Sequence, residues 1–154
     1  MVRRVRSKDA AETEALAAEL AHTLMPGDVV LLSGELGAGK TTFVRGAARA
    51  LGVTGPVSSP SFAIGNLYGT GPGAPVAKVA HLDLYRLASL AEEDPDLLAD
   101  YIGPDSVSFV EWPGEGDTAI AELGVVRYRV SISHDAGGRV VEVKPALEVE
   151  GEPQ

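Results

Sequence analysis

One glycine-rich run constrains this chain more than any other feature of its sequence. The run is Gly34-Glu35-Leu36-Gly37-Ala38-Gly39-Lys40-Thr41, which matches the pattern G-x-x-x-x-G-K-[ST]. The apolar segment before it, residues 29–32, is typical of a strand buried on both faces of a sheet. The segment after it, from Thr41 to about Leu51, predicts a helix that Gly52 closes. Strand, loop and helix in this order are the setting that a phosphate-binding loop, or P-loop, requires.

The residue types of this loop suit phosphate binding. Glycines let backbone N–H groups curl around phosphate oxygens, and the start of a helix adds partial positive charge at the same place. We expect Lys40 to reach the β- and γ-phosphates of a nucleotide and the Thr41 hydroxyl to contact Mg²⁺. The alternative is a glycine-rich turn that matches the pattern by chance, which the flanking strand and helix disfavour.

Two carboxylates are candidates for the chemistry beside the loop. Glu111 ends an apolar run, where a P-loop protein needs a second acidic residue near magnesium; it could contact Mg²⁺ through a water or polarise the attacking water. Asp83 shares the polar side of an alternating segment with His81 and Tyr85, where it could orient a water or a magnesium ligand. The structural alternative at Glu111 is a carboxylate that only ends a strand. At Asp83 it is a surface ion pair with Arg86, beside partly buried neighbours.

The remaining pattern predicts a mixed α/β fold. Asp9 and Glu12 mark the start of an amphipathic helix that runs to about Leu24. Further elements are expected as strands at 63–68, 79–85 and 107–112, an acidic helix at 87–101, and strands at 125–133 and 139–144 that form a hairpin through 134–138. The strand at 79–85 is expected to have one polar and one apolar face. We therefore expect a three-layer P-loop NTPase fold with a mixed parallel and antiparallel sheet, its antiparallel part late in the chain as a C-terminal β-hairpin.

Length and composition bound the domain organisation. The 154 residues suit one P-loop ATPase domain over 1–154 with a frayed acidic tail at about 146–154. The N-terminal cations are expected to form a solvated terminus; they are Arg3, Arg4, Arg6 and Lys8. The sequence has no cysteine, which excludes disulfides and thiolate metal sites. It also has no apolar run typical of a membrane span or a signal peptide, so we expect a cytoplasmic protein with no membrane contact.

The net charge argues against direct binding of nucleic acid. The chain has 13 Lys and Arg against 22 Asp and Glu, which gives a net charge of −9. A chain with this balance gains little from the phosphate backbone of a nucleic acid. A free-standing nucleic-acid-binding protein is therefore not expected.

Four motifs in order give this sequence a resemblance to a known family. They are the P-loop run continued by Thr42-Phe43, then Ser59-Pro60-Ser61-Phe62, His81-Leu82-Asp83-Leu84-Tyr85-Arg86 and Val110-Glu111-Trp112-Pro113. Over about residues 7 to 144 the chain resembles the bacterial TsaE family, the ATPase component of tRNA threonylcarbamoyladenosine biosynthesis. One departure is Ser61, where the family commonly has threonine; serine keeps the hydroxyl with which a switch loop would sense a γ-phosphate. Trp112 is expected to pack over the nucleotide site or in the core.

The resemblance implies a set of functional residues. By similarity, nucleotide contacts fall on the P-loop and two outlying residues, namely Gly37, Ala38, Gly39, Lys40, Thr41, Thr42, Arg139 and Thr13. Magnesium contacts fall on Thr41 and Glu111, and residues for catalysis are Asp83, Glu111 and Lys40. The implied ligands are therefore ATP and Mg²⁺. The implied partners are TsaD and TsaB, which carry threonylcarbamoyl to the adenosine beside the anticodon, so that tRNA is met only indirectly through the complex.

Other functions are compatible with a P-loop. A small kinase that phosphorylates a metabolite would need a lid and several arginines to clamp two phosphorylated substrates. The arginines left for that purpose are few: Arg86, Arg127, Arg129 and Arg139. A GTPase would need an Asn-Lys-x-Asp element to recognise guanine, and the sequence has none. A non-catalytic interaction module gated by nucleotide is not separated by sequence from a slow ATPase.

Overall fold

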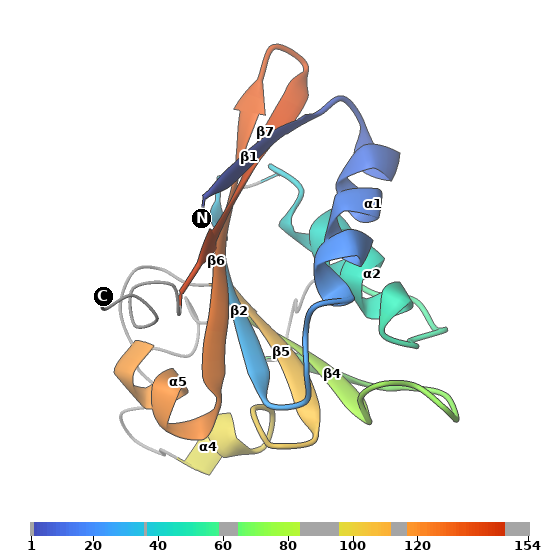
Figure 1. Cartoon of the computed structure of the whole chain (residues 1–154), viewed down its shortest axis with the longest axis vertical. Coiled ribbons are helices and arrows are strands. Elements are labelled where there is room, and N and C mark those ends of the chain that lie inside the picture. The colour runs from blue at the N-terminus through green and yellow to red at the C-terminus, as the bar shows by residue number, and fades with distance from the viewer. Residues whose placement is uncertain (1, 36, 59–64, 84–95, 112–116, 147–154) are drawn as a thin grey trace.

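The computed structural model describes residues 2–35, 37–58, 65–83, 96–111 and 117–146, which contain both strands and helices (Figure 1). The strands are β1 (Arg3–Ser7), β2 (Asp28–Gly34), β3 (Gly65–Gly69), β4 (Lys78–Asp83), β5 (Ser106–Glu111), β6 (Val125–Asp135) and β7 (Gly138–Pro145). The helices are α1 (Ala10–Ala21), α2 (Lys40–Ala50), α4 (Asp96–Ala99) and α5 (Asp117–Leu123). None of these helices has the length and apolar character needed to cross a membrane.

The strands form one seven-stranded sheet in the order β1-β7-β6-β2-β5-β4-β3. β2 pairs in parallel with β5 and β6, and β5 pairs in parallel with β4. The pairs β1–β7, β6–β7 and β3–β4 are antiparallel. The predicted mixed sheet with a C-terminal hairpin is therefore confirmed. The expectation that antiparallel pairing lies late in the chain is wrong in part, because β3 pairs with β4 and the N-terminal β1 adds to β7.

The alternating side chains of β2 determine the three layers. Val30 and Leu32 belong to one core with residues of α1 and α2, and Val29 and Leu31 belong to a second core with residues of α4 and α5. All four side chains are at most 1% exposed, as expected of a strand covered on both faces. Figure 1 shows α1 and α2 on one side of the sheet and α4 and α5 on the other. The three-layer α/β fold of P-loop NTPases is thus confirmed.

The start of α1 follows from its capping residues. The backbone N–H of Glu12 donates to Asp9 Oδ1 at 2.9 Å, and the backbone N–H of Lys8 donates to Glu12 Oε1 at 2.8 Å. The first bond satisfies a backbone donor that the helix itself leaves open, and the second ties Glu12 to the residue just before the cap. The predicted start is confirmed. The helix ends at Ala21, earlier than expected, although Leu24 is still buried in the core.

The N-terminal arm is ordered as a strand, contrary to the expectation of a solvated terminus. The residues expected to form a solvated terminus instead form β1, an edge strand in register with β7. Each of its cations, and the lysine that follows it, forms an ion pair: Arg3 with Glu19, Arg4 with Glu142, Arg6 with Asp135 and Lys8 with Glu12. Charged side chains along an edge strand also hinder pairing with further strands. The arm is therefore part of the sheet.

Several other expectations change in detail. The polar face expected for 79–85 is wrong at His81, whose side chain is fully buried. The strand expected at 63–68 is observed as β3, and the hairpin turn is shorter than expected, with Ala136 and Gly137 both at positive φ, as a two-residue type I′ turn requires. The sequence analysis does not predict α5.

Some expectations fall outside the described residues. Most of the acidic helix expected at 87–101 is among them, so that only α4 and the residues after it are described there. Also outside are Ser61, Tyr85, Arg86, Trp112 and the tail beyond residue 146.

α1 and α2 approach each other closely at Gly46. A Cβ atom on Gly46 would collide with the backbone of Glu14 in α1, whose Cα would lie only 2.6 Å from it. The Glu14 carboxylate also forms ion pairs with Arg45 at 3.5 Å and Arg49 at 3.8 Å in α2. α1 can therefore lie this close to the P-loop helix α2 only because residue 46 is a glycine.

We predict that Gly46→Ala destabilises the protein. In an unconstrained helix, alanine is more stable than glycine by about 0.5–1 kcal/mol. Here overpacking against backbone should reverse the sign and lower the free energy of unfolding by about 1–3 kcal/mol. Urea denaturation followed by circular dichroism measures the change. Gly55→Ala is the matched control, because a Cβ there meets no atom within 4 Å; an equally stable Gly46→Ala protein would contradict the prediction.

Candidate functional site

The loop between β2 and α2 contains backbone conformations that favour glycine. Gly37 and Gly39 have φ angles of 77° and 115°, a region that other residues rarely adopt. A Cβ atom on either glycine would meet no heavy atom within 4 Å, so the space beside the loop is open. At Gly34 a Cβ atom would collide with the backbone oxygen of Ile132 in β6. The loop is thus shaped by its glycines and accessible to a ligand.

The start of α2 is suited to an anion. Its N-cap residue is Gly39, which provides no side-chain hydrogen bond, and the first backbone N–H groups of a helix have no partner within it. Lys40 Nζ donates to the backbone oxygen of Gly34 at 2.6 Å, so the ammonium group lies across the loop. Backbone N–H groups, helix dipole and ammonium charge therefore favour phosphate oxygens at this place.

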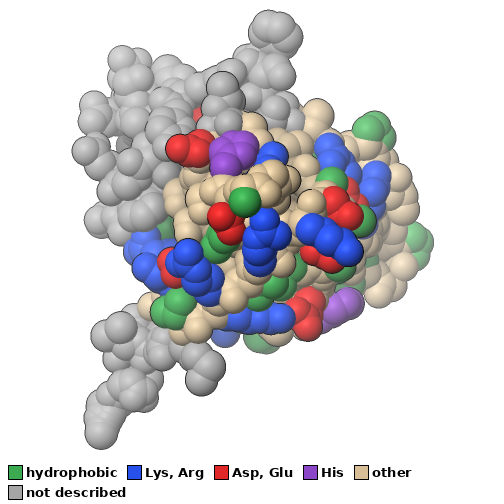
Figure 2. All heavy atoms as spheres, turned by 90° about the horizontal axis from the view of Figure 1, so that it is seen from above, with side chains coloured by type: hydrophobic (Ala, Val, Ile, Leu, Met, Phe, Trp, Pro, Cys, Tyr) green, Lys and Arg blue, Asp and Glu red, His purple; other side chains and the backbone are tan. Residues whose placement is uncertain are grey.

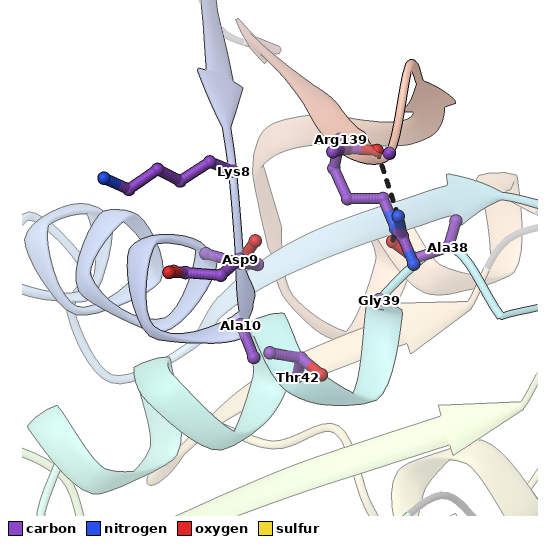
Figure 3. Close-up of a pocket in the computed structure, with 10 residues that line it drawn as sticks. Lys8, Asp9, Ala10, Ala38, Gly39, Thr42 and Arg139 are labelled. Atoms are coloured by element: carbon purple, nitrogen blue, oxygen red, sulfur yellow. Dashed lines mark hydrogen bonds between the residues drawn. The ribbon is translucent and has the colours of Figure 1, made fainter.

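Arg139 in β7 reaches the same loop from the hairpin. Its Nε donates to the backbone oxygen of Ala38 at 2.8 Å, and its Nη2 donates to the backbone oxygen of Gly37 at 3.3 Å. In Figure 3 the guanidinium group extends from β7 toward Ala38. The structure therefore brings Arg139 to the P-loop as expected, and its observed partners are loop carbonyl groups.

A cavity lies beside the P-loop on the side of α1 and the hairpin. Its volume is about 180 Å³. Its walls come from the start of α1, the P-loop and the β6–β7 turn, and the lining residues are Lys8, Asp9, Ala10, Thr13, Ala38, Gly39, Thr42, Gly137, Gly138 and Arg139 (Figure 3). Five residues that the sequence analysis assigned to nucleotide contacts therefore line one cavity: Thr13, Ala38, Gly39, Thr42 and Arg139.

Thr13 lines this cavity with a hydroxyl that is already hydrogen-bonded. Its side chain is 2% exposed, and its Oγ1 lies 2.7 Å from Ser7 Oγ. The Ser7 hydroxyl donates to the backbone oxygen of Asp9 at 2.9 Å. The Thr13 hydroxyl must then donate to Ser7, which leaves only its acceptor lone pairs for a ligand.

The two carboxylates lie at the carboxyl edge of the sheet. Strand register pairs Asp83 with Glu111, and Glu111 with Leu32 just before the P-loop. Because neighbouring strands lie about 4.8 Å apart, Glu111 is one strand and Asp83 two strands from the start of the loop. Parallel pairing thus brings together the loop and both carboxylates.

Sequence analysis missed one contact in this group. His81 Nε2 lies 2.9 Å from Glu111 Oε2, and the His81 side chain is fully buried. Both residues point to the face of the sheet that α2 covers, since they lie two residues along their strands from Val79 and Phe109 of that core. In the sequence, His81 and Asp83 lie two residues apart, which places them on the same face of a strand. Only the register of β4 against β5 shows which carboxylate His81 meets.

The residues present fit a nucleotide phosphate with magnesium. Thr41 at the start of α2 supplies a hydroxyl, and Glu111 supplies a carboxylate on the adjacent strand. Among the described residues, no three His, Cys, Asp or Glu side chains gather as a metal site. Magnesium bound with a nucleotide needs no such cage, because phosphate oxygens and waters provide most of its ligands.

The charge on this side of the molecule also suits an anionic ligand. Figure 2 views the protein from above, toward the hairpin turn and the start of α1. Several Lys and Arg side chains gather on the described part of this face, some of them beside Asp or Glu. At the loop itself Lys40 and Arg139 supply positive charge, even though the whole chain carries −9.

Comparisons with known proteins agree with this architecture. The family model described as "Threonylcarbamoyl adenosine biosynthesis protein TsaE" matches residues 7–141. A TsaE protein of Streptomyces coelicolor is 45% identical over 130 residues, which cover 84% of this chain and 84% of that protein. A TsaE protein of Bacillus subtilis is 43% identical over 108 residues, which cover 70% of this chain and 64% of that protein.

A solved structure matches the fold. The crystal structure of Bacillus subtilis YdiB superposes with a TM-score of 0.64 at 30% sequence identity, and the match covers 94% of this chain and 86% of that one. Because the family model spans most of the chain and the Streptomyces coelicolor relative is 45% identical over most of both proteins, this chain belongs to the TsaE family.

Proposed function

We propose that this protein is a magnesium-dependent ATPase that acts in the cytoplasm and supports the transfer of threonylcarbamoyl to tRNA adenosine, together with TsaB- and TsaD-type partners. The observation that carries the ATPase part is the geometry of the P-loop beside two carboxylates. Gly37 and Gly39 adopt glycine conformations next to open space, and Glu111 and Asp83 lie on the next two strands. The names of the matching family and relatives support the pathway.

Phosphate binding would use a side chain of the loop, Lys40, that in this structure forms a hydrogen bond to the loop backbone. Lys40 Nζ holds the Gly34 carbonyl oxygen at 2.6 Å, and a phosphate oxygen is a stronger acceptor for an ammonium group because it is charged. Lys40 would therefore turn from the carbonyl to the β- and γ-phosphates, while the backbone N–H groups of Gly37 to Thr42 surround the phosphate oxygens.

The nucleoside would lie toward the cavity beside α1. Thr42 follows the magnesium-binding position and lines this cavity, as do Thr13 and Arg139. The Thr13 hydroxyl would accept a hydrogen bond from the ligand, since its own hydrogen is directed to Ser7. Arg139 would contribute positive charge beside the loop and hold the carbonyl groups of Gly37 and Ala38 in place.

Hydrolysis would need a metal and an oriented water. Magnesium, when bound, would neutralise charge on the β- and γ-phosphate oxygens, and Thr41 and Glu111 are the residues that would hold it. Asp83 lies one strand farther from the loop than Glu111, where its carboxylate would orient the attacking water and receive its proton. We expect the isolated protein to hydrolyse ATP slowly until partner proteins complete the site.

The proposed role for tRNA is indirect. The net charge of −9 gives this chain little attraction to a phosphate backbone. Its local cations near the P-loop suit a small anion such as a nucleotide. In the proposed complex the partner proteins would therefore make the main contacts with tRNA.

We predict that Lys40→Ala weakens nucleotide binding. Loss of the charge-assisted hydrogen bonds to phosphate should cost about 3 kcal/mol, or roughly a 100-fold increase in the dissociation constant. Titration with a fluorescent ATP analogue in the presence of Mg²⁺ measures this. Lys78→Ala is the matched control, because Lys78 pairs with Asp105 at the opposite end of the strands. Equal affinity for all three proteins would overturn the P-loop assignment.

We predict that Asp83→Asn keeps nucleotide binding but lowers turnover by about 100-fold or more, since a positioned acid or base contributes about 10²–10⁴-fold. The measurement is multiple-turnover incorporation of labelled threonylcarbamoyl into tRNA by TsaB and TsaD with threonylcarbamoyl-adenylate supplied, alongside ATP hydrolysis with and without the partners. Asp105→Asn serves as the control. Normal tRNA modification with Asp83→Asn would favour a nucleotide-gated interaction module instead of an ATPase.

A further inference from the structure

His81 is a fully buried polar residue between apolar neighbours and the carboxylates at the strand ends. Its side chain has no exposed surface, and Val79, Val107 and Phe109, which share its face on β4 and β5, are fully buried hydrophobic side chains, whereas Asp83 and Glu111 follow on the same face. Burying an imidazole costs free energy unless its polar atoms are hydrogen-bonded. An apolar side chain would fill this place without that cost. What the imidazole provides, and an apolar side chain could not, is its hydrogen bond.

That contact determines where the ring hydrogen lies. His81 Nε2 lies 2.9 Å from Glu111 Oε2, and a carboxylate oxygen only accepts. Nε2 must therefore carry a hydrogen and donate it. Nδ1 is buried and has no hydrogen-bond partner within the described part of the chain. The ring is thus directed by one strong hydrogen bond, and that bond goes to Glu111.

His81 holds the Glu111 carboxylate at one of its two oxygens. The hydrogen bond joins His81 Nε2 to Oε2 and does not involve Oε1. The Glu111 side chain is 13% exposed, compared with 0% for His81, so the carboxylate stands between a buried donor and the edge of the sheet. One oxygen is thereby fixed from within the core, while the side chain keeps some exposed surface at the end of β5, next to the strand that leads into the P-loop.

We propose that His81 is a positioning residue: its Nε2–H holds the Glu111 carboxylate in the orientation in which the second oxygen serves magnesium. This inference rests on the proposed function, because it assigns Glu111 to the metal. His81 itself would touch neither nucleotide nor metal, because its side chain has no exposed surface. β4 and β5 pair in the register that places Asp83 opposite Glu111. This pairing fixes the backbones of His81 and Glu111 relative to each other, so the sheet determines the direction of the hydrogen bond. Partners of this kind typically change metal affinity by about 10- to 100-fold when they are lost.

The test measures the affinity of the site for a metal ion directly. Binding of Mn²⁺ in the presence of ADP, followed by electron paramagnetic resonance, reports metal affinity without turnover, and a fluorescent ADP analogue with excess EDTA reports nucleotide affinity without metal. We expect His81→Leu to weaken Mn²⁺ binding by about 10- to 100-fold and to leave metal-free ADP affinity unchanged. Val79→Ala is the structural control, since Val79 shares the strand and the face but lies opposite Val107, four residues along β5 from Glu111.

A second pair of variants separates the hydrogen bond from packing. In His81→Gln the amide nitrogen can take the place of Nε2, whereas in His81→Asn it is too near the backbone to reach Glu111. We expect glutamine to restore most of the Mn²⁺ affinity and asparagine to restore none. This comparison also tests the inference if His81→Leu does not fold.

A double-mutant cycle completes the design. If His81 acts through Glu111, then His81→Leu added to Glu111→Gln should weaken Mn²⁺ binding no further. Unchanged metal affinity in His81→Leu, an equal loss in Val79→Ala, or additive losses in the double mutant would each overturn the inference. If instead the wild-type protein binds neither nucleotide nor Mn²⁺ with ADP, the proposed function fails, and the inference fails with it.

Discussion

The parallel pairing of β2, β5 and β4 is the constraint on which the rest of the site depends. Parallel strands end at the same edge of a sheet, and here the register places Leu32, Glu111 and Asp83 side by side. β2 has strand neighbours on both sides, β5 and β6, so the loop after it opens at the point where strand order reverses. A ligand at the P-loop therefore meets carboxylates that are distant in sequence.

The hairpin β6–β7 supports the loop from the other side. Arg139 donates to two loop carbonyl groups, and Gly34 passes so close to Ile132 that no side chain fits between them. Lys40 holds the carbonyl oxygen of Gly34 from the start of α2. Hydrogen bonds from both α2 and β7 thus hold the loop backbone, and a change in either element would alter the space available for phosphate.

Much of the fold could be predicted because its strongest signals are local. The apolar run of β2, the glycines of the loop, the Asp9 cap of α1 and the hairpin each depend on short-range chemistry. β1 could not be predicted in this way, because Val5 is its only hydrophobic side chain against the core and its arginines resemble a solvated tail. α5 is short, and its place in the second core depends on Ile120 meeting β2 and α4.

The sequence by itself determined the P-loop, its lysine and the threonine that we propose as a magnesium ligand, since a glycine pattern between a buried strand and a helix has few other solutions. It also identified Glu111 and Asp83 as candidates, but not their distance from the loop or their neighbours. Only the tertiary structure decided that His81 donates to Glu111, that Thr13 donates to Ser7 and that Arg139 holds loop carbonyl groups. These contacts join residues on different strands and helices, and strand register, which is set by packing of the whole sheet, determines which side chains meet.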